Sequence, residues 1–310
     1  MYFTGIADEA GTLLDTQIRA TRELGWENIE ARIVEVHGYP AGNIHDIPDA
    51  AFEKLVGKLH ATGIKVSGFG SAIGNWGKKI EESGESSLAE TRRAIPRMQR
   101  LGAKMIRIMS FAPLDGEEQM EEERFRRLRE IVKMFLDAGI QPVHENCMNY
   151  GGMGWPFTLK LLRHVPGLKL VFDTGNPILN ADRTQPKPWP QQDSWEFYSH
   201  VKEHVIHVHV KDAVWIPSRK DAEYKFPGEG DGQVHRILKD LFASGYNGGI
   251  SIEPHMAVVF HDQNVKSSPE AQYNNYIEYG RRMEKMVREI KAELSLGRSV
   301  SDSPSVSISL

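Results

Sequence analysis

The segment that decides the fold is Val205-Ile206-His207-Val208-His209-Val210-Lys211-Asp212. Side chains alternate along a strand, so its apolar residues share one face, and His207, His209 and Lys211 share the other. An ordinary half-exposed strand does not carry two imidazoles and an ammonium opposite an apolar row. The pattern predicts a parallel strand with helices over its apolar face and a polar cavity at the end of its other face.

On both sides of this segment, short apolar stretches alternate with longer amphipathic ones. We expect strands at residues 2–6, 28–33, 65–70, 104–110, 140–145, 168–173, 205–211 and 249–253. Helices are expected at residues 13–24, 48–62, 87–101, 117–138, 157–164, 194–203, 234–244 and 270–294. Eight alternating units predict an α/β fold, a (β/α)8 TIM barrel that forms a single domain over residues 1–294. A doubly wound sheet is the alternative, but Asp8-Glu9-Ala10-Gly11 is not the glycine-rich turn that usually follows its first strand.

The composition is that of a soluble globular protein. Of 310 residues, 40% are hydrophobic and 26% are charged, and the formal net charge is −4, which gives no reason to expect a nucleic acid or a membrane as a partner. The single cysteine, Cys147, excludes an intrachain disulfide and favours a cytoplasmic location. Met1–Gly5 lacks the basic and then apolar character of a signal peptide, so none is expected, and no apolar run approaches the ~18–20 residues of a membrane span. The serine-rich residues 295–310 are expected to form a disordered tail.

Four consecutive expected strands end in a side chain of metal-ligand type. These residues are Glu145, Asp173, His209 and Glu253. Adjacent strands lie ~4.8 Å apart, so the ends of neighbouring barrel strands can reach one point. Three carboxylates and an imidazole suit one divalent cation, with Mn²⁺ preferred and Mg²⁺, Co²⁺ or Zn²⁺ as alternatives. A single acid at a strand end is more often a helix cap or an ion-pair partner, but four in succession favour a metal site.

Other polar residues lie near these ends, each with a structural alternative. His207 lies one layer deeper than His209 and is either a hydrogen-bonded core histidine or a functional group. His144 has the opposite parity to Glu145, which favours a structural hydrogen bond over a catalytic role. His255 shares the parity of Glu253 and can line the pocket. Arg107 and Glu30 point inward and can pair with each other or with Arg32, and Arg107 can instead contact a substrate.

These residues resemble the xylose isomerase-like TIM barrels of sugar isomerases and epimerases. The likeness covers nearly the whole chain and is most specific in Asp173-Thr174-Gly175-Asn176, in the segment 206–212 and in the segment 245–253. The resemblance implies that Glu145, Asp173, His209 and Glu253 bind the metal. It implies also that Glu145 and Glu253 move protons and that Lys211 lies near the substrate's oxygens.

Two features depart from the common pattern of that family. Asn176 stands where many members have a histidine that helps to hold the substrate carbonyl, which puts a plain ketose 3-epimerase in doubt. His144 stands beside the fifth-strand ligand, an arrangement similar to the metal-dependent subunit of enzymes that cleave 3-oxo-C-glycosides. Through that likeness His144 is a third catalytic candidate, and a small accessory subunit is an alternative to the expected homo-oligomer.

The function that the resemblance implies is a metal-dependent sugar isomerase or epimerase. It would remove a proton next to a carbonyl and form a metal-stabilised enediolate. A lyase or dehydratase acting on a keto-sugar or inosose is the alternative. An endonuclease IV-type DNA-repair enzyme would need more metal ligands and a basic surface, and a non-catalytic sugar-binding barrel would bind without proton exchange.

Two long connections, 146–156 and 212–232, follow ligand-bearing strands and are expected to close over a small-molecule sugar. The first carries Trp155 and the second Trp215, whose rings can stack on a sugar. The segment Gly228-Glu229-Gly230-Asp231-Gly232 either cradles a phosphate or forms a turn in which Asp231 caps the next helix.

Overall fold

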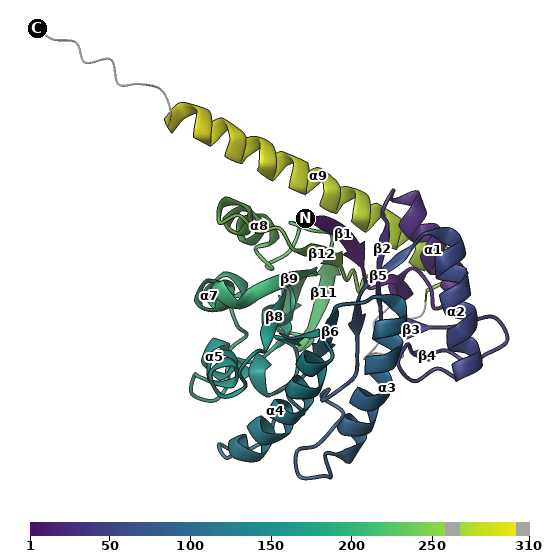
Figure 1. The fold of residues 1–310 in the computed structure, drawn as a ribbon. Coiled ribbons are helices and arrows are strands. Elements are labelled where there is room, and N and C mark those ends of the chain that lie inside the picture. Colours follow the sequence, from purple (N-terminus) through teal and green to yellow (C-terminus); the bar gives the residue numbers. More distant parts are fainter. Residues whose placement is uncertain (258–266, 302–310) are drawn as a thin grey trace, which may run out of the picture.

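The computed structural model of the chain describes residues 1–257 and 267–301, and its central feature is a barrel of eight parallel strands (Figure 1). Their order around the barrel is β1-β12-β9-β8-β7-β6-β5-β2. A parallel bridge between Ile6 and Glu30 brings the two outermost strands together, so the barrel is nearly closed. The strands are β1 (Tyr2–Gly5), β2 (Asn28–Ala31), β5 (Lys65–Gly70), β6 (Met105–Ile108), β7 (Gln141–Glu145), β8 (Lys169–Asp173), β9 (Val205–Val210) and β12 (Gly249–Ile252). The predicted (β/α)8 TIM barrel is confirmed.

Helices cover the outside of the barrel (Figure 1). They are α1 (Leu14–Glu23), α2 (Asp49–Thr62), α3 (Glu85–Leu101), α4 (Glu121–Asp137), α5 (Trp155–His164), α7 (Ser194–Val201), α8 (Val234–Ala243) and α9 (Pro269–Ser301). In α4 three glutamates occupy the first turn, where negative charge favours a helix, and Gly139 follows its end with a φ of 72°. No helix among the described residues is long and apolar enough to cross a membrane.

The two faces of β9 separate the apolar core from the polar interior of the barrel. Val208 and Val210 belong to the buried core between sheet and helices, where they lie in one cluster with Phe172 and Ile237. The opposite face places His209 inside the barrel, fully buried. The sequence alternation therefore gives this strand the two environments that it predicted.

Smaller elements lie at the ends of the barrel strands, and all but η3, which directly precedes β9, follow a strand toward the mouth. They are η1 (Ala7–Glu9), β3 (Ile33–Val34), β4 (Gly42–Asn43), η2 (Tyr150–Met153), α6 (Asn176–Leu179), η3 (Lys202–His204), β10 (Asp212–Ile216) and β11 (Asp221–Lys225). The sequence pattern predicted none of them, because they are short and depend on contacts with the barrel. Helix α9 continues to Ser301, past the end expected at residue 294. Residues 302–310 lie outside the described part of the chain, so their predicted disorder stays a prediction.

Candidate metal centre

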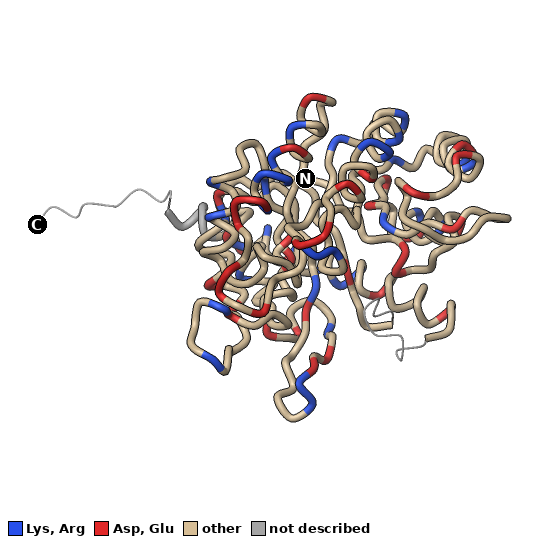
Figure 2. The backbone as a smooth tube through the Cα atoms, turned by 90° about the horizontal axis from the view of Figure 1, so that it is seen from below, with Lys and Arg blue, Asp and Glu red and all other residues tan. Residues whose placement is uncertain are grey.

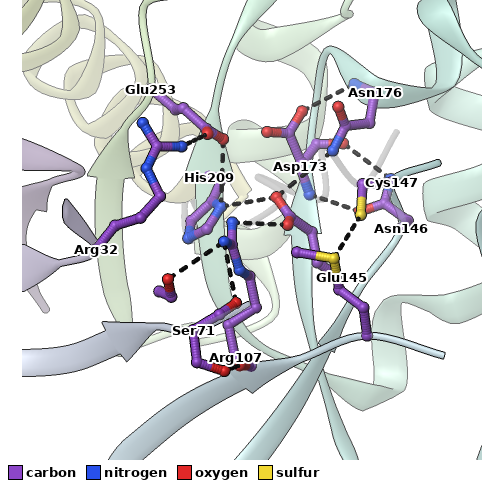
Figure 3. Close-up of polar contacts among 12 residues, drawn as sticks. Arg32, Ser71, Arg107, Glu145, Asn146, Cys147, Asp173, Asn176, His209 and Glu253 are labelled. Atoms are coloured by element: carbon purple, nitrogen blue, oxygen red, sulfur yellow. Dashed lines mark hydrogen bonds and ion pairs between the residues drawn. The ribbon is translucent and has the colours of Figure 1, made fainter. Parts of the chain in front are cut away.

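The ends of β7, β8, β9 and β12 bring four side chains to one point (Figure 3). Glu145, Asp173, His209 and Glu253 each offer a ligand atom within 4.8 Å of the others, and all four are buried. His209 Nδ1 lies 3.0 Å from Glu145 Oε1 and 3.6 Å from Glu253 Oε2. The structure therefore gathers the four residues that the sequence selected.

A deeper layer of the barrel fixes the orientation of His209. Glu30 on β2 lies with Oε1 2.9 Å from His209 Nε2 and with Oε2 2.8 Å from His207 Nε2. An ionised carboxylate only accepts hydrogen bonds, so both imidazoles donate N–H to Glu30. Burial opposes ionisation of His209, but Glu30, Glu145 and Glu253 hold its pKa well above the usual range, so Nδ1 carries a proton toward Glu145 and Glu253. A cation that displaced this proton would meet the Nδ1 lone pair.

Three buried carboxylates surround His209 Nδ1, and positive charge between them stabilises their ionised forms. Asp173 Oδ2 and Glu253 Oε2 are buried and have no hydrogen bond among the described residues, although Lys211 Nζ lies 3.0 and 3.1 Å away. Such orphaned oxygens beside an imidazole nitrogen fit the oxygen-rich coordination of a divalent cation. The residues present thus fit the metal that the sequence implied.

Two arginines hold the outer oxygens of the two glutamates (Figure 3). Arg107 NH1 donates to Glu145 Oε2 at 2.9 Å, and Arg32 NH1 donates to Glu253 Oε1 at 2.7 Å. Each glutamate therefore presents one oxygen to an arginine and the other to His209. Glu30 pairs with the histidines, so the predicted alternative of a pair between Arg107 and Glu30 is wrong.

The ionisation of the cluster follows from these neighbours. Burial alone would raise the pKa of Glu145, but Arg107 and His209 lower it to about 2. Burial opposes ionisation of Glu253 as well, while Lys211, His255 and His209 hold its pKa well below the usual range. For Asp173, burial and the neighbouring Glu253 outweigh Lys211 and raise the pKa to about 6. Both glutamates are therefore ionised at neutral pH.

Backbone contacts hold Asp173 in place. Its Oδ1 accepts hydrogen bonds from the amides of Gly175 and Asn176, both at 2.8 Å. The side chain of Asn146 joins the ends of β7 and β8, because it accepts from Asp173 N at 2.8 Å and donates to Asp173 O at 3.0 Å. The sequence analysis did not identify Asn146, since a single asparagine after a strand gives no specific signal.

A cavity of about 360 Å³ opens above the cluster. Four predicted substrate-binding residues line it: Arg107, Asn176, Lys211 and His255. Lys211 Nζ donates to Asn176 Oδ1 at 3.2 Å, and His255 Nδ1 lies 2.6 Å from Glu9 Oε1. Arg32 and Trp76 line the same cavity and were missed as site residues. Arg32 could have been found, because it shares the polar face of its segment with Glu30.

Three predicted site residues lie elsewhere. His144 is buried on the outer side of β7, where its Nε2 lies 2.9 Å from Ser110 Oγ and 3.0 Å from Asn149 Oδ1, so its catalytic assignment is wrong. His207 lies beneath the site against Glu30 and does not line the cavity, so its substrate-binding assignment is wrong. Trp155 stacks on His200 with 3.8 Å between ring centroids, away from the cavity, and is likewise corrected.

The glycine-rich turn after β11 binds a side chain of the protein itself. The amides of Gly228, Gly230 and Gly232 donate to the carboxylate of Asp212 at 2.8 to 3.1 Å. This carboxylate occupies the place that was considered for a phosphate. The N-cap of α8 is Gln233, without a capping side chain, so the capping role considered for Asp231 is wrong too.

A parallel barrel with a candidate metal centre at the carboxyl ends of its strands defines the class of this protein as a TIM barrel. The family model of the xylose isomerase-like TIM barrel matches residues 18–283, and the chain belongs to that family. No curated protein matches the chain.

Solved structures share the fold at low identity. A D-tagatose 3-epimerase-like protein is 16% identical, with a TM-score of 0.68 over 95% of this chain and 100% of its own. D-psicose 3-epimerase from Clostridium cellulolyticum H10, solved with D-tagatose, is 16% identical, with a TM-score of 0.64 over 94% of this chain and 99% of its own. A xylose isomerase-like TIM barrel protein from Mycobacterium smegmatis, solved in complex with magnesium, is 16% identical, with a TM-score of 0.63 over 93% of this chain and 97% of its own.

Proposed function

We propose that this protein is a divalent-metal-dependent sugar isomerase or epimerase that moves a proton next to a carbonyl group. The observation that carries the proposal is the meeting of Glu145, Asp173, His209 and Glu253 at the mouth of the barrel, where carboxylate oxygens of Glu145 and Glu253 lie 3.0 and 3.6 Å from His209 Nδ1. The names of structurally similar proteins support a sugar as substrate, because they include epimerases of tagatose and psicose.

In this proposal the four residues hold one divalent cation, with Mn²⁺ preferred and Mg²⁺, Co²⁺ or Zn²⁺ as alternatives. When bound, the cation would act as a Lewis acid on the carbonyl oxygen of the sugar. Glu30 keeps the Nδ1 lone pair of His209 directed at the cation, and Lys211 neutralises carboxylate charge beside it.

Glu145 and Glu253 are the proposed proton-transfer groups. They approach His209 Nδ1 from two different strands and are ionised at neutral pH, which a proton acceptor requires. Removal of a proton next to the carbonyl gives an enediolate, and the cationic side chains of Arg107 and Lys211 line the cavity where its charge develops. Asn176 and His255 are proposed to position the hydroxyl groups of the sugar.

The surface charge favours a small substrate over DNA. Acidic and basic positions are interleaved along the backbone in the view of Figure 2, instead of forming one basic face. A duplex carries dense negative charge and is bound mainly by lysine and arginine, so a DNA-directed enzyme needs such a face.

The test is solvent proton exchange on a panel of keto-sugars and polyols. Protein loaded with Mn²⁺ is incubated in D₂O, and deuterium next to the carbonyl is followed by NMR. We expect exchange on at least one sugar, and its loss both in metal-stripped protein and in the variant Asp173→Asn. Cleavage of a duplex with an abasic site, without exchange on any sugar, would favour the endonuclease instead. Metal retention without either activity would favour a sugar-binding barrel.

A further inference from the structure

A second cluster of metal-ligand side chains lies outside the cavity and the candidate metal centre. It consists of His45, Asp46 and Glu90, each of which offers a ligand atom within 4.8 Å of the others. His45 and Asp46 follow β4, and Glu90 belongs to α3, which lies beside that strand (Figure 1). None of the three lines the cavity, so the cluster needs an explanation of its own.

The histidine of this cluster is fully buried, and neither of its ring nitrogens has a hydrogen bond among the described residues. Its Nε2 lies 3.4 Å from Asp46 Oδ2. Burial is the main cause that lowers the pKa of His45 to about 4, although Asp46 opposes the shift. The nearby cations Lys78, Arg93 and Arg97 lower this pKa further. The ring is therefore neutral at pH 7, and a neutral imidazole has a lone pair that a metal ion can bind.

The two carboxylates of the cluster each bind a cationic side chain. Arg93 Nε donates to Asp46 Oδ1 at 2.8 Å, while Oδ2 of the same carboxylate is the atom near His45. Asp46 therefore divides its oxygens between an arginine and a histidine, as the two glutamates of the candidate metal centre do. Lys78 Nζ donates to Glu90 Oε2, so a metal ion would compete with this lysine for the glutamate.

The charged side chains around the histidine form matched ion pairs. The pairs are Asp46 with Arg93, Glu90 with Lys78 and Asp49 with Arg97. A divalent cation therefore gains little from net charge here, and its affinity must come from bonds to the imidazole nitrogen and the carboxylate oxygens. Zn²⁺ forms such bonds with His, Asp and Glu, and it binds mixed nitrogen and oxygen sites more tightly than Mn²⁺ does. The chemistry of the donor set thus favours Zn²⁺.

The cluster lies behind one wall of the cavity. His45 is two residues after Asn43, Lys78 is two residues after Trp76, and both Asn43 and Trp76 line the cavity. Lys78 Nζ also donates to the carbonyl oxygen of Ala72, a third lining residue, at 2.9 Å. An ion bound by the three ligands would therefore connect the segment after β4 to α3 and brace this wall.

We propose that His45, Asp46 and Glu90 form a second metal site, which is structural and selective for Zn²⁺. The ion is bound by Nε2 of His45 and by one oxygen of each carboxylate, and it displaces Lys78 from Glu90. The proposed proton transfer uses none of these residues, so this inference stands apart from the proposed function.

The test counts zinc ions and locates them. Protein is equilibrated with excess Zn²⁺ by dialysis, its zinc content is measured, and the ions are located in crystals by anomalous scattering at the zinc edge. We expect a zinc ion at His45 in the wild-type protein, in addition to any at the candidate metal centre. His45→Gln and Glu90→Gln should each lose this ion alone. The control is His235→Gln, which removes an exposed histidine 3.2 Å from Glu293 and should keep it.

A variant with the opposite effect makes the test sharper. Lys78→Met removes the cation that competes for Glu90, so it should tighten zinc binding at this site about tenfold in a calorimetric titration. Zinc binding that is unchanged or weaker in Lys78→Met would contradict the proposed displacement and overturn the inference.

The other outcomes are equally decisive. Crystals of the wild-type protein without zinc at His45, or equal zinc content in the wild type and both glutamine variants of the cluster, would overturn the inference even if proton exchange on sugars succeeds. Zinc at His45 that is lost in those variants, in a protein without exchange activity, would support the inference while the proposed function fails.

Discussion

Two polar clusters lie one above the other inside this barrel, and they share His209. In the deeper one, Glu30 offers one oxygen to His207 and one to His209, so its acceptors and the two N–H donors are matched. In the upper one, three carboxylates meet His209 Nδ1, and Asp173 Oδ2 and Glu253 Oε2 have no hydrogen bond among the described residues. Both clusters consist of metal-ligand side chains, and the deeper one also has a buried atom without a hydrogen bond among the described residues, His207 Nδ1. Only the upper cluster reaches the cavity, through Glu145 and Glu253.

The difference shows how composition alone misleads about a site. Residue types and burial are alike in the two clusters, but in the deeper one both oxygens of Glu30 bind imidazoles, so this cluster positions its neighbour. The upper one faces a cavity and is the proposed site of the cation. A substitution in the upper cluster should therefore act on chemistry, and one in the deeper cluster on the geometry of the metal site.

The largest effect is expected from Glu253→Gln in the upper cluster. The amide keeps an oxygen for the cation but cannot accept a proton, so we expect kcat to fall by roughly 10²–10⁴ while most of the metal is retained. Exchange in D₂O and metal content measure the two properties separately. Glu229→Gln, at an exposed glutamate paired with Arg282, is the control. Exchange at the wild-type rate would move the base to another cavity residue, with His255 as the nearest candidate.

A smaller effect on a different property is expected from Glu30→Ala in the deeper cluster. Without this acceptor the His209 ring loses the bond that sets its tautomer, and loss of such a partner commonly weakens metal binding ~10–100-fold. Calorimetric titration with Mn²⁺ measures the affinity directly. The control is Glu27→Ala, which removes an exposed glutamate just before the same strand. Unchanged affinity in Glu30→Ala would show that the two clusters are independent.

These two clusters also show how much of the site could be predicted from the sequence. Period-two alternation placed His207 and His209 inside the barrel, and the succession of strand ends selected Glu145, Asp173 and Glu253. The sequence could not predict the partner of each group. Arg32 and Glu253, for example, are distant in the chain and meet only when the barrel closes. The parity of one residue along a strand could not predict the hydrogen-bond partners of His144. The lengths of the two connections could not show that Trp155 stacks on His200 while Trp215 lines the cavity.

A third prediction extends the comparison to His144, which is sealed on the outer side of β7. Burial lowers its pKa to about 4, against an ordinary value near 6.5, so the unfolded chain binds the proton more readily. Stability contributed by the neutral ring is present above pH 6.5 and is lost as the pH falls toward 4, by about 2 kcal/mol between pH 7.5 and 5. Urea unfolding should show this loss in the wild type and a correspondingly smaller one in His144→Gln.

The control for that experiment is His60→Gln, because His60 is exposed on α2 and its removal should leave the pH dependence of unfolding unchanged. His144→Gln should also keep the Mn²⁺ affinity and the exchange activity, since the ring does not line the cavity. Loss of exchange in a folded His144→Gln variant would restore the catalytic role that the structure argues against.

The smallest functional effect is expected from Trp155→Ala. Its ring stacks on His200 and packs against the core cluster between β9 and the outer helices. Like His144, it therefore lies away from the cavity, although it follows a ligand-bearing strand. We expect KM and kcat to stay within about twofold of the wild type and the melting temperature to fall, because the loss is one of packing. Trp215→Ala is the matched comparison, since that ring follows β9, another ligand-bearing strand, but lines the cavity, and it should raise KM. If Trp155→Ala raised KM as strongly as Trp215→Ala, the connection 146–156 would have to move over the cavity when substrate binds. Residues that lie away from the cavity in this structure would then contact the substrate on that side of the barrel.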